Sequence, residues 1–527
     1  MPIYEVLERH RRENPLAIAT SGDNGELNYR ELANQVDAVA KSLVASGVEK
    51  GDRIVTLAPP CEAFWISYLA TVSIGAVWSG LNPRYRSLEY QARLQALQPK
   101  VVFTCSVLDG RDYCREMQDA VDTFADDFSA EVVSFESPET STVVRYDSFL
   151  ARGNSITGDS YESCRNDVAD DDIAVIVYTS GSTGLPKGAM LSHGAMLRCA
   201  STSARWLGDS LEKAIMAYPI NHIGGLNGLC MNVFMYGGCI RFLARFSIPD
   251  VIEIGERENI TFVGHGQTTL AMLVDTEGFD LTKMRACRTL IHGGSKTSEK
   301  TLAYFWPLDA AITSVYAQTE SCGYILRSLR DASLDVAANT LGKPLDGVDI
   351  RIVDPQTGEV LKPGDVGELQ AKFDWIFSGY FNNAEATEEA ITSDGYLRTG
   401  DLCKIRPDGN IELVDRIKQM FKSGGHSIFP AEIEQAICLH PSIALAAVLG
   451  VDDDRFGTVG LAFITAKAGT SIDIEEVSEF LKERIANYKV PKHYRVLSEM
   501  PTLPNTKIDK QALKELGNAL PRERTCN

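Results

Sequence analysis

Helix and strand patterns alternate over the first 150 residues of the chain. Asn28 and Glu31 have the spacing of a capping box, in which each side chain satisfies a backbone N–H of the other residue. Apolar residues then recur at helical intervals: Leu32, Val36, Val39, Ala40 and Leu43. Gly47 supplies a stop signal, and residues 53–57 have the pattern of a strand. Repeated strand–helix–strand units predict a parallel sheet with helices on both faces.

Two long stretches without charged residues have the length of membrane-spanning segments. Residues 63–83 contain no charged side chain and are long enough to cross a bilayer. Small and polar residues interrupt them: Ser67, Thr71, Ser73, Gly75, Ser79, Gly80 and Asn82. The pattern therefore favours a buried helix at about residues 63–72 followed by a buried strand at about residues 76–78. Residues 218–240 show the same mixture and are also predicted to be interior.

The pattern changes twice in the second half of the chain. Residues 347–353 alternate with period two, and Gly358 and Gly364 predict turns, so we expect antiparallel strands that form a small barrel. After Asp415 the chain has apolar runs of its own and a helix capped by Asp473. The remaining positions of this C-terminal pattern are residues 444–451, residues 459–465, Glu476 at the cap, and the apolar stripe Ile474, Val477, Phe480, Leu481 and Ile485.

Composition narrows the class of protein. A chain of 527 residues predicts two or more domains, and its formal net charge of −19 would repel nucleic acid and anionic membranes, so we expect neither as a partner. The twelve cysteines are scattered singly, which argues against a zinc ribbon or a disulfide scaffold. The charged start lacks the apolar core of a secretory signal. Together these features predict a cytoplasmic protein without a stable membrane span.

The richest candidate chemistry lies in residues 178–188, Tyr-Thr-Ser-Gly-Ser-Thr-Gly-Leu-Pro-Lys-Gly. They follow residues 173–178, an apolar run that predicts a buried strand. Glycines allow the backbone to present N–H groups to an anion, hydroxyls donate hydrogen bonds, and Lys187 adds positive charge. The loop therefore predicts a polyphosphate site at a strand end. It differs from the common P-loop, which requires Gly-Lys-Ser/Thr.

The string Thr-Ser-Gly-Ser-Thr-Gly-Leu-Pro-Lys-Gly resembles the signature loop of the adenylate-forming superfamily, which includes acyl- and aryl-CoA ligases, beetle luciferases and nonribosomal adenylation domains. Five further strings agree with it in order and spacing over nearly the whole chain. The resemblance implies an α/β fold. A large AMP-binding N-terminal domain of stacked mixed or parallel sheets with helices and a small β-barrel, residues 1–415, would precede a small mobile α+β lid domain, residues 416–527.

The resemblance also implies which residues bind Mg·ATP. The phosphate loop would use Thr179, Ser180, Gly181, Ser182, Thr183, Gly184 and Lys187. The adenine would lie against Gly293, Gly294 and Ser295, with Tyr316 stacked near it, and Ala317 and Gln318 would also belong to the nucleotide site. Thr319 would bond the α-phosphate, and Glu320 would hold Mg²⁺, a hard cation that prefers carboxylate and phosphate oxygens. Asp401 would accept hydrogen bonds from both ribose hydroxyls, with Arg416 as a second ribose contact.

The remaining strings concern catalysis and the acyl acceptor. Lys507, in Pro-Asn-Thr-Lys-Ile, stands where the family has its catalytic lysine, and Lys418 stands at the hinge. Gly424 and Gly425 would line the tunnel for the pantetheine arm of coenzyme A (CoA). His222 would lie near the substrate carboxylate or the thioester tunnel, with a satisfied core histidine as the alternative.

Four positions depart from the family pattern. Ala317 and Thr506 replace common glycines, and Gln267 and Lys296 stand where proline is usual. An extra methyl group at Ala317 would narrow the acyl pocket or shift the nucleotide, and Gln267 leaves the shape of that pocket open.

The sequence thus predicts a two-step ligase. ATP would activate a small carboxylic acid to an acyl-adenylate with release of pyrophosphate, and CoA would then take the acyl group. An ATP-dependent amide ligase and an enzyme that loads a carrier protein remain alternatives because they share the activation step. A non-catalytic nucleotide-binding protein is disfavoured because Glu320, Asp401, Arg416 and Lys507 are all present. Medium-chain, branched and aryl acids are all allowed.

Overall fold

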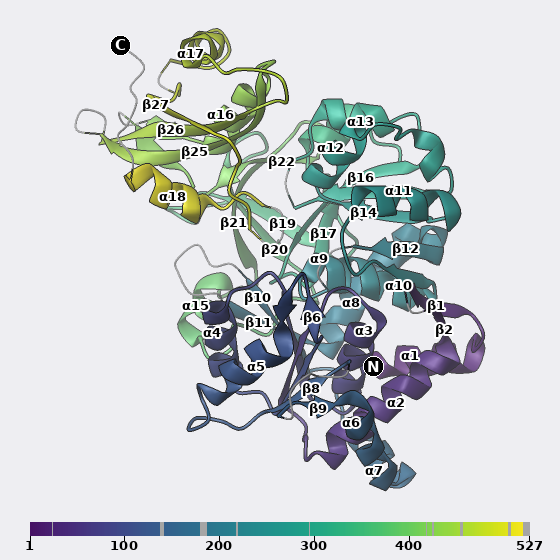
Figure 1. Ribbon diagram of the computed structural model, residues 1–527. Helices are drawn as coiled ribbons and strands as arrows, with labels where there is room; N and C mark the ends of the chain where they lie inside the picture. The colour runs from purple at the N-terminus through teal and green to yellow at the C-terminus, as the bar shows by residue number, and fades with distance from the viewer. Residues whose placement is uncertain are drawn as a thin grey trace. The chain divides into compact units, whose positions relative to one another are not determined.

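The computed structural model describes residues 1–23, 25–136, 142–179, 187–217, 220–294, 296–417, 419–423, 426–453, 457–487, 489–503 and 507–519. The chain forms two compact units, and each is described by itself below (Figure 1). The first unit comprises residues 1–349 and 372–397, and the second comprises residues 350–371 and 398–527. This division reflects compactness and does not locate a hinge. The boundary between an N-terminal domain and a lid domain at residues 415 and 416 therefore stays a prediction.

Within the described part of the first unit, one sheet has seven strands in the order β11-β10-β4-β3-β5-β8-β9. Their bounds are β3 (Arg53–Leu57), β4 (Val77–Leu81), β5 (Val101–Thr104), β8 (Glu131–Ser134), β9 (Val144–Arg145), β10 (Ile173–Thr179) and β11 (Lys187–Ser192). All neighbouring pairs are parallel except β10 and β11. The predicted parallel sheet is confirmed, and so is the buried strand that leads into the phosphate loop.

Helix α2 (Tyr29–Ala45) begins as its sequence predicts. The Glu31 N–H donates to Asn28 Oδ1 at 2.9 Å, and the Asn28 N–H donates to Glu31 Oε2 at 2.9 Å. Leu32, Val36 and Val39 are buried on the inner face. Gly47 follows the helix with φ of +77°, a left-handed conformation that glycine adopts without steric cost.

The uncharged residues 63–83 form a buried helix and a strand. Helix α3 (Glu62–Ser73) is buried over almost its whole surface, and strand β4 follows it. The strand extends to Leu81, further than predicted, because it stays paired with the parallel strand β3, where Thr56 is in register with Gly80 and Leu57 with Leu81. Among the described helices, none combines the length and the apolar character needed to cross a membrane.

A second sheet of the first unit runs β18-β17-β16-β15-β14-β12-β13-β1-β2 through the described residues. Its strands are β1 (Ile18–Gly22), β2 (Gly25–Asn28), β12 (Lys213–Met216), β13 (Cys239–Phe242), β14 (Phe262–His265), β15 (Thr289–Gly293), β16 (Ala311–Gln318), β17 (Gly323–Arg327) and β18 (Lys343–Pro344). Strands β14, β15 and β16 are parallel, so their carboxyl ends meet at one edge. That edge carries the predicted adenine-binding residues.

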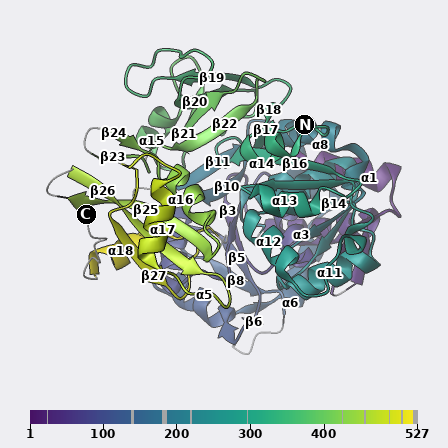
Figure 2. The same ribbon diagram turned by 90° about the horizontal axis from the view of Figure 1, so that it is seen from above.

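Helices cover one face of this second sheet. They are α11 (Ile248–Arg257), α12 (Gln267–Asp275), α13 (Glu299–Phe305) and α14 (Leu334–Asn339). Figures 1 and 2 show α11, α12 and α13 beside β14 and β16. Ile254, Leu290, Leu302 and Phe305 form part of the apolar core between these helices and the sheet.

The second unit contains the region predicted as a small barrel. There the described strands form a four-stranded sheet in the order β19-β20-β21-β22. The strands are β19 (Asp349–Val353), β20 (Gly367–Lys372), β21 (Leu397–Ile405) and β22 (Ile411–Arg416). A two-stranded hairpin of β23 (Phe421–Ser423) and β24 (His426–Ile428) follows it in the chain.

The C-terminal part of the second unit has its own core, as predicted. Strands β25 (Ile443–Asp453), β26 (Gly457–Ala466) and β27 (His493–Leu497) form its sheet, and its helices are α16 (Pro430–Cys438), α17 (Ile474–Lys482) and α18 (Lys510–Ala519). Asp473 Oδ1 caps α17 by accepting from the Glu475 and Glu476 N–H groups, and Val477 and Leu481 are buried in the core. The predicted cap is therefore confirmed, and so is the stripe for Val477 and Leu481 in the core and for Ile474 and Ile485 packed against it.

Candidate active site

The predicted phosphate loop joins two paired strands. Thr179, the last residue of β10, lies in register with Lys187, the first residue of β11. The Thr179 hydroxyl also donates to the Lys187 carbonyl at 3.4 Å. Five predicted loop residues lie outside the described residues: Ser180, Gly181, Ser182, Thr183 and Gly184. The structure therefore fixes both ends of the loop and leaves its phosphate contacts as a prediction.

The strand before the loop rests on a polar cluster. The Arg93 guanidinium lies 4.1 Å from the Tyr85 ring centroid and 5.6 Å from that of Tyr178, the residue before Thr179. Arg111 donates to the carbonyl oxygens of Pro83, at 2.7 Å, and Tyr85, at 3.0 Å.

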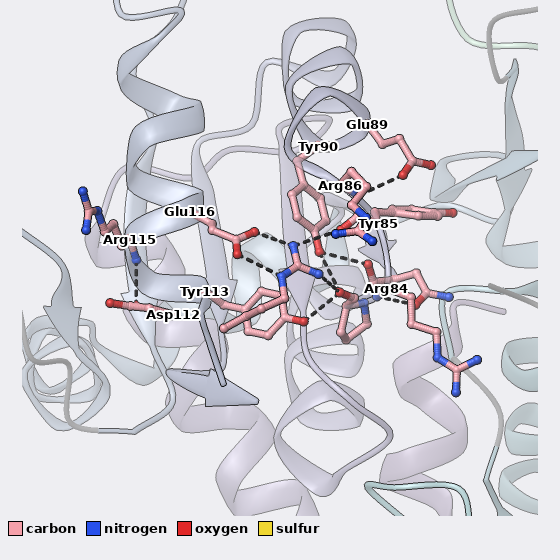
Figure 3. Close-up of polar contacts among 12 residues, drawn as sticks. Arg84, Tyr85, Arg86, Glu89, Tyr90, Asp112, Tyr113, Arg115 and Glu116 are labelled. Atoms are coloured by element: carbon pink, nitrogen blue, oxygen red, sulfur yellow. Dashed lines mark hydrogen bonds and ion pairs between the residues drawn. The ribbon is translucent and has the colours of Figure 1, made fainter. Parts of the chain in front are cut away.

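Two tyrosines and a glutamate complete this cluster (Figure 3). Arg111 Nε donates to Glu116 at 2.9 Å, and the Tyr113 hydroxyl donates to the Pro83 carbonyl at 2.7 Å. The Tyr90 hydroxyl donates to the same carbonyl at 3.1 Å. These bonds fix the backbone of residues 83–85, and Arg93 connects Tyr85 with Tyr178 near the end of β10.

Two glycines bring the predicted adenine-binding segments close together. Gly293 ends β15 in register with Val315 of the parallel strand β16. A Cβ atom at Gly293 would lie 2.5 Å from the Val315 carbonyl oxygen, so only glycine fits there. Gly294 has φ of +77°, which also favours glycine. The structure therefore places Gly293 against Val315, the residue before Tyr316; Ser295 lies outside the described residues.

Thr319 and Glu320 lie in the tight turn that joins β16 to β17. The Gln318 N–H donates to Ser321 Oγ at 2.9 Å, and the Cys322 N–H donates to the Thr319 carbonyl at 3.0 Å. Gln318 Nε2 also donates to the Tyr316 hydroxyl at 3.0 Å. Thr319 is buried and Glu320 is half-buried, so the turn fixes both residues at the carboxyl end of a central strand.

Sequence reasoning missed Tyr380, which lies against two predicted site residues. Its hydroxyl donates to Glu320 Oε1 at 2.6 Å, and Lys187 Nζ lies 5.1 Å from the centroid of its ring. Burial raises the pKa of the Tyr380 phenol, and the charge of Glu320 raises it further, so the phenol stays protonated and donates. The contact joins residues 60 positions apart, and no local sequence pattern reports such a pairing.

His222 stands at the N-terminal cap of the short helix α9 (Ile223–Gly225). Its Nδ1 accepts from the Gly224 N–H at 3.1 Å. The π-helix η3 (Leu226–Cys230) continues directly from α9 and is buried. His222 therefore has a local structural role, and its predicted proximity to the substrate is not tested by these contacts.

The two predicted ribose contacts are neighbours in the second unit. Asp401 of β21 lies in register with Arg416 of β22, and Arg416 Nε contacts Asp401 Oδ1 at 3.0 Å. The Asp401 side chain is 2% exposed, whereas that of Arg416 is 57% exposed. A buried carboxylate with a solvent-facing guanidinium beside it is suited to binding a polar ligand with several hydroxyls.

Lys507 belongs to the same group of charges. It is exposed, yet desolvation of its ammonium group lowers its pKa, the charge of Arg416 lowers it further, and Asp401 opposes both effects. Its carbonyl accepts from the Leu503 N–H at 2.7 Å, and Thr502 bridges to Ile508, so the turn that bears Lys507 is closed. Lys418, Gly424 and Gly425 lie outside the described residues.

Comparison with known proteins identifies two matching families. The model for AMP-binding enzymes matches residues 7–381, and the model for the C-terminal domain of AMP-binding enzymes matches residues 432–510. Feruloyl-CoA synthase from an Amycolatopsis species is 30% identical over 95% of this chain and 96% of its own length. Peroxisomal OPC-8:0-CoA ligase 1 from Arabidopsis thaliana is 30% identical over 97% of this chain and 92% of its own length.

The fold is also similar to that of a solved structure. ATP-bound MatB from Rhodopseudomonas palustris superposes with a TM-score of 0.87 at 27% sequence identity. The match covers 98% of this chain and 99% of that one. The similarity therefore extends over the whole fold.

Proposed function

Because the chain belongs to the family of AMP-binding enzymes, we propose that it activates a carboxylic acid with ATP and transfers the acyl group to CoA. The observation that carries this proposal is the grouping of Lys507 with Asp401 and Arg416. This group supplies a cation beside two candidate ribose contacts. The relatives named above are CoA ligases, which supports a thiol as the acceptor.

In the first half-reaction, a carboxylate oxygen of the substrate attacks the α-phosphate of ATP in line. The bond to pyrophosphate breaks, and an acyl-adenylate remains. Because both reactants are anions, catalysis depends on neutralising charge and holding the groups in line more than on a general base. Lys507 and Lys187 carry positive charge for this purpose, and Thr319 donates a hydroxyl to the α-phosphate.

The residues present fit a magnesium ion at Glu320. The turn holds this carboxylate half-buried at a strand end, and a phenol rather than a cation occupies one of its oxygens. Magnesium commonly binds one or two protein carboxylates together with substrate phosphates, so no larger cluster is needed. Within the described residues, His, Cys, Asp and Glu side chains form no group of three that could hold a metal. When bound, the ion would neutralise phosphate charge.

In the second half-reaction, the CoA thiol attacks the acyl carbon and AMP leaves. We propose that the C-terminal residues turn about Lys418 between the two steps. This movement would withdraw Lys507 and present Gly424 and Gly425 to the pantetheine arm. A cytoplasmic location and the absence of nucleic-acid partners stay predictions; the described cysteines are free thiols, as a reducing compartment allows.

Pyrophosphate release across a panel of medium-chain, branched and aryl acids tests the proposal. The purified chain receives ATP, Mg²⁺ and one acid, and then CoA, an amine or a carrier-protein thiol. We expect acid-dependent pyrophosphate release and an acyl-CoA thioester. An amide or a loaded carrier protein as the main product would replace the CoA proposal with one of the alternatives. Binding of ATP without pyrophosphate release for any acid would support a non-catalytic protein.

A further inference from the structure

Residues 377–381 tie together two parts of the candidate active site. The Ser378 N–H donates to the Met190 carbonyl, and the Met190 N–H donates to the Gly379 carbonyl, so the segment pairs with β11. The Phe377 N–H donates to the Glu320 carbonyl at 3.0 Å. One short segment therefore contacts both the strand that begins at Lys187 and the turn that bears Glu320.

The position of Tyr380 within this segment is fixed by its backbone. Its N–H donates to Thr387 Oγ1 at 2.8 Å, and Tyr380 forms an isolated bridge with Ala189 of β11. Gly379 has φ of +113°, and a Cβ atom there would lie 2.8 Å from Thr387 Cγ2, so the approach requires glycine. The Tyr380 ring also packs edge-on against Phe377, with the centroids 4.9 Å apart.

The hydroxyl of Tyr380 contacts an anionic side chain, and its ring face lies near a cationic one. The hydroxyl donates to Glu320 Oε1 at 2.6 Å, a short bond of the charge-assisted kind. The ring face lies 5.1 Å from Lys187 Nζ, within the range of a cation–π contact. Tyr380 thus fixes the spacing between the candidate metal carboxylate and the candidate phosphate lysine before any nucleotide arrives.

We propose that Tyr380 is a positioning residue that aligns the Glu320 carboxylate for a divalent cation and the Lys187 ammonium for the nucleotide phosphates. The inference rests on the proposed function for the identity of the ligand, Mg·ATP. A carboxylate oxygen has two lone pairs, so a bond from the phenol leaves room for a cation on the same group. Groups held in their binding geometry need no reorganisation when the ligand binds.

Two substitutions separate the two contacts. Tyr380→Phe keeps the ring beside Lys187 and removes the hydroxyl from Glu320. Tyr380→Leu removes both contacts. Tyr304→Phe is the matched control. Tyr304 lies in α13, which carries no candidate site residue, and the hydroxyl that the substitution removes donates to the Phe279 carbonyl at 3.0 Å.

The measurement is binding of Mn²⁺, a paramagnetic substitute for Mg²⁺, to each variant in the presence of ATP and without acid. Electron paramagnetic resonance reports free Mn²⁺, and calorimetry with metal-free ATP reports the phosphate contacts alone. For Tyr380→Phe we expect the half-saturating Mn²⁺ concentration to rise about tenfold, the size expected for one hydrogen bond to a charged group, with metal-free ATP binding unchanged. Tyr380→Leu should weaken metal-free ATP binding as well, and Tyr304→Phe should change neither.

Tyr380→Phe with the same Mn²⁺ dependence as the parent chain would overturn the proposal. Equal weakening by Tyr304→Phe would also overturn it, because the effect would then be a general loss of stability. In a Glu320→Gln background, Tyr380→Phe should add little, since the two residues act through one contact. If no acid supports pyrophosphate release but Tyr380→Phe still weakens Mn²⁺ binding, the proposed function fails and the positioning role stands.

Discussion

At the scale of single residues, Lys187 and Lys507 have different surroundings. Lys187 begins a strand and lies over an aromatic ring, which limits the directions that its ammonium can take. Lys507 is exposed, and desolvation of its ammonium group and the charge of Arg416 lower its pKa, whereas the charge of Asp401 opposes both effects. A lysine in such surroundings is suited to stabilise the negative charge that develops in the transition state.

Lys507→Ala should separate the two half-reactions. Adenylate formation, measured as acid-dependent pyrophosphate release, should fall about a hundredfold or more, because one charged donor to the transition state is lost. Thioester formation from supplied acyl-adenylate should continue, since that step does not use this ammonium. Lys482→Ala, which removes an exposed lysine of α17 that pairs with Glu479, is the control and should leave both steps intact.

Equal loss of both half-reactions in Lys507→Ala would contradict this assignment. It would mean that Lys507 supports the fold or binds a group common to both steps. Unfolding temperatures of the parent chain and both lysine variants distinguish a folding defect from a catalytic one.

At the scale of elements, the sequence predicted what neighbouring residues determine. The capping box of α2, the buried helix α3 and the cap of α17 all depend on residues within a few positions of each other, and all are confirmed. The strand before the phosphate loop is confirmed for the same reason.

Contacts between distant segments could not be predicted in this way. The pairing of residues 377–381 with β11 depends on backbone hydrogen bonds across nearly 200 residues, which leave no period in the sequence. The hydrogen bond from Tyr380 to Glu320 could not be predicted from the sequence for the same reason. The family resemblance supplied the predicted roles of Asp401 and Arg416, and the register of β21 and β22 brings the two residues together.

Two buried histidines on neighbouring strands predict how stability depends on pH. His265 of β14 and His292 of β15 are in register, and burial lowers the pKa of each to about 4. In an unfolded chain the value is about 6.5, so between these limits the unfolded chain binds more protons. The free energy of unfolding should therefore fall as the pH falls through this window, by about 1 kcal/mol per pH unit for each histidine.

Urea unfolding at a series of pH values measures this slope. His292→Asn keeps a polar side chain at the position and removes the titration, so its slope between about pH 6 and about pH 5 should be smaller than that of the parent chain. Ser314→Ala, in register on β16, is the control and should shift stability without changing the slope. An unchanged slope in His292→Asn would refute the assignment.

At the scale of the whole molecule, the proposed machinery is distributed over both compact units. Thr179, Lys187 and Glu320 belong to the first, and Asp401 and Lys507 belong to the second. A reaction with two half-reactions can be regulated by a change of conformation within the second unit, provided that a few residues absorb the change in backbone angles. Lys418 is the proposed pivot, and its flanking residues are held: Ile417 N–H donates to the Gly400 carbonyl at 2.9 Å.

Lys418→Pro should slow the second half-reaction and spare the first. Proline fixes φ near −65°, which removes the rotation that a pivot requires. In the proposed mechanism, the arrangement in which Lys507 lies with Asp401 and Arg416 is the one that forms the adenylate, so a chain fixed in this arrangement should still release pyrophosphate in a single turnover. Acyl-CoA formation from supplied acyl-adenylate should fall, whereas Lys418→Ala, which keeps φ free, should retain it. Loss of single-turnover pyrophosphate release in a folded Lys418→Pro chain, or full acyl-CoA formation by it, would place the pivot elsewhere.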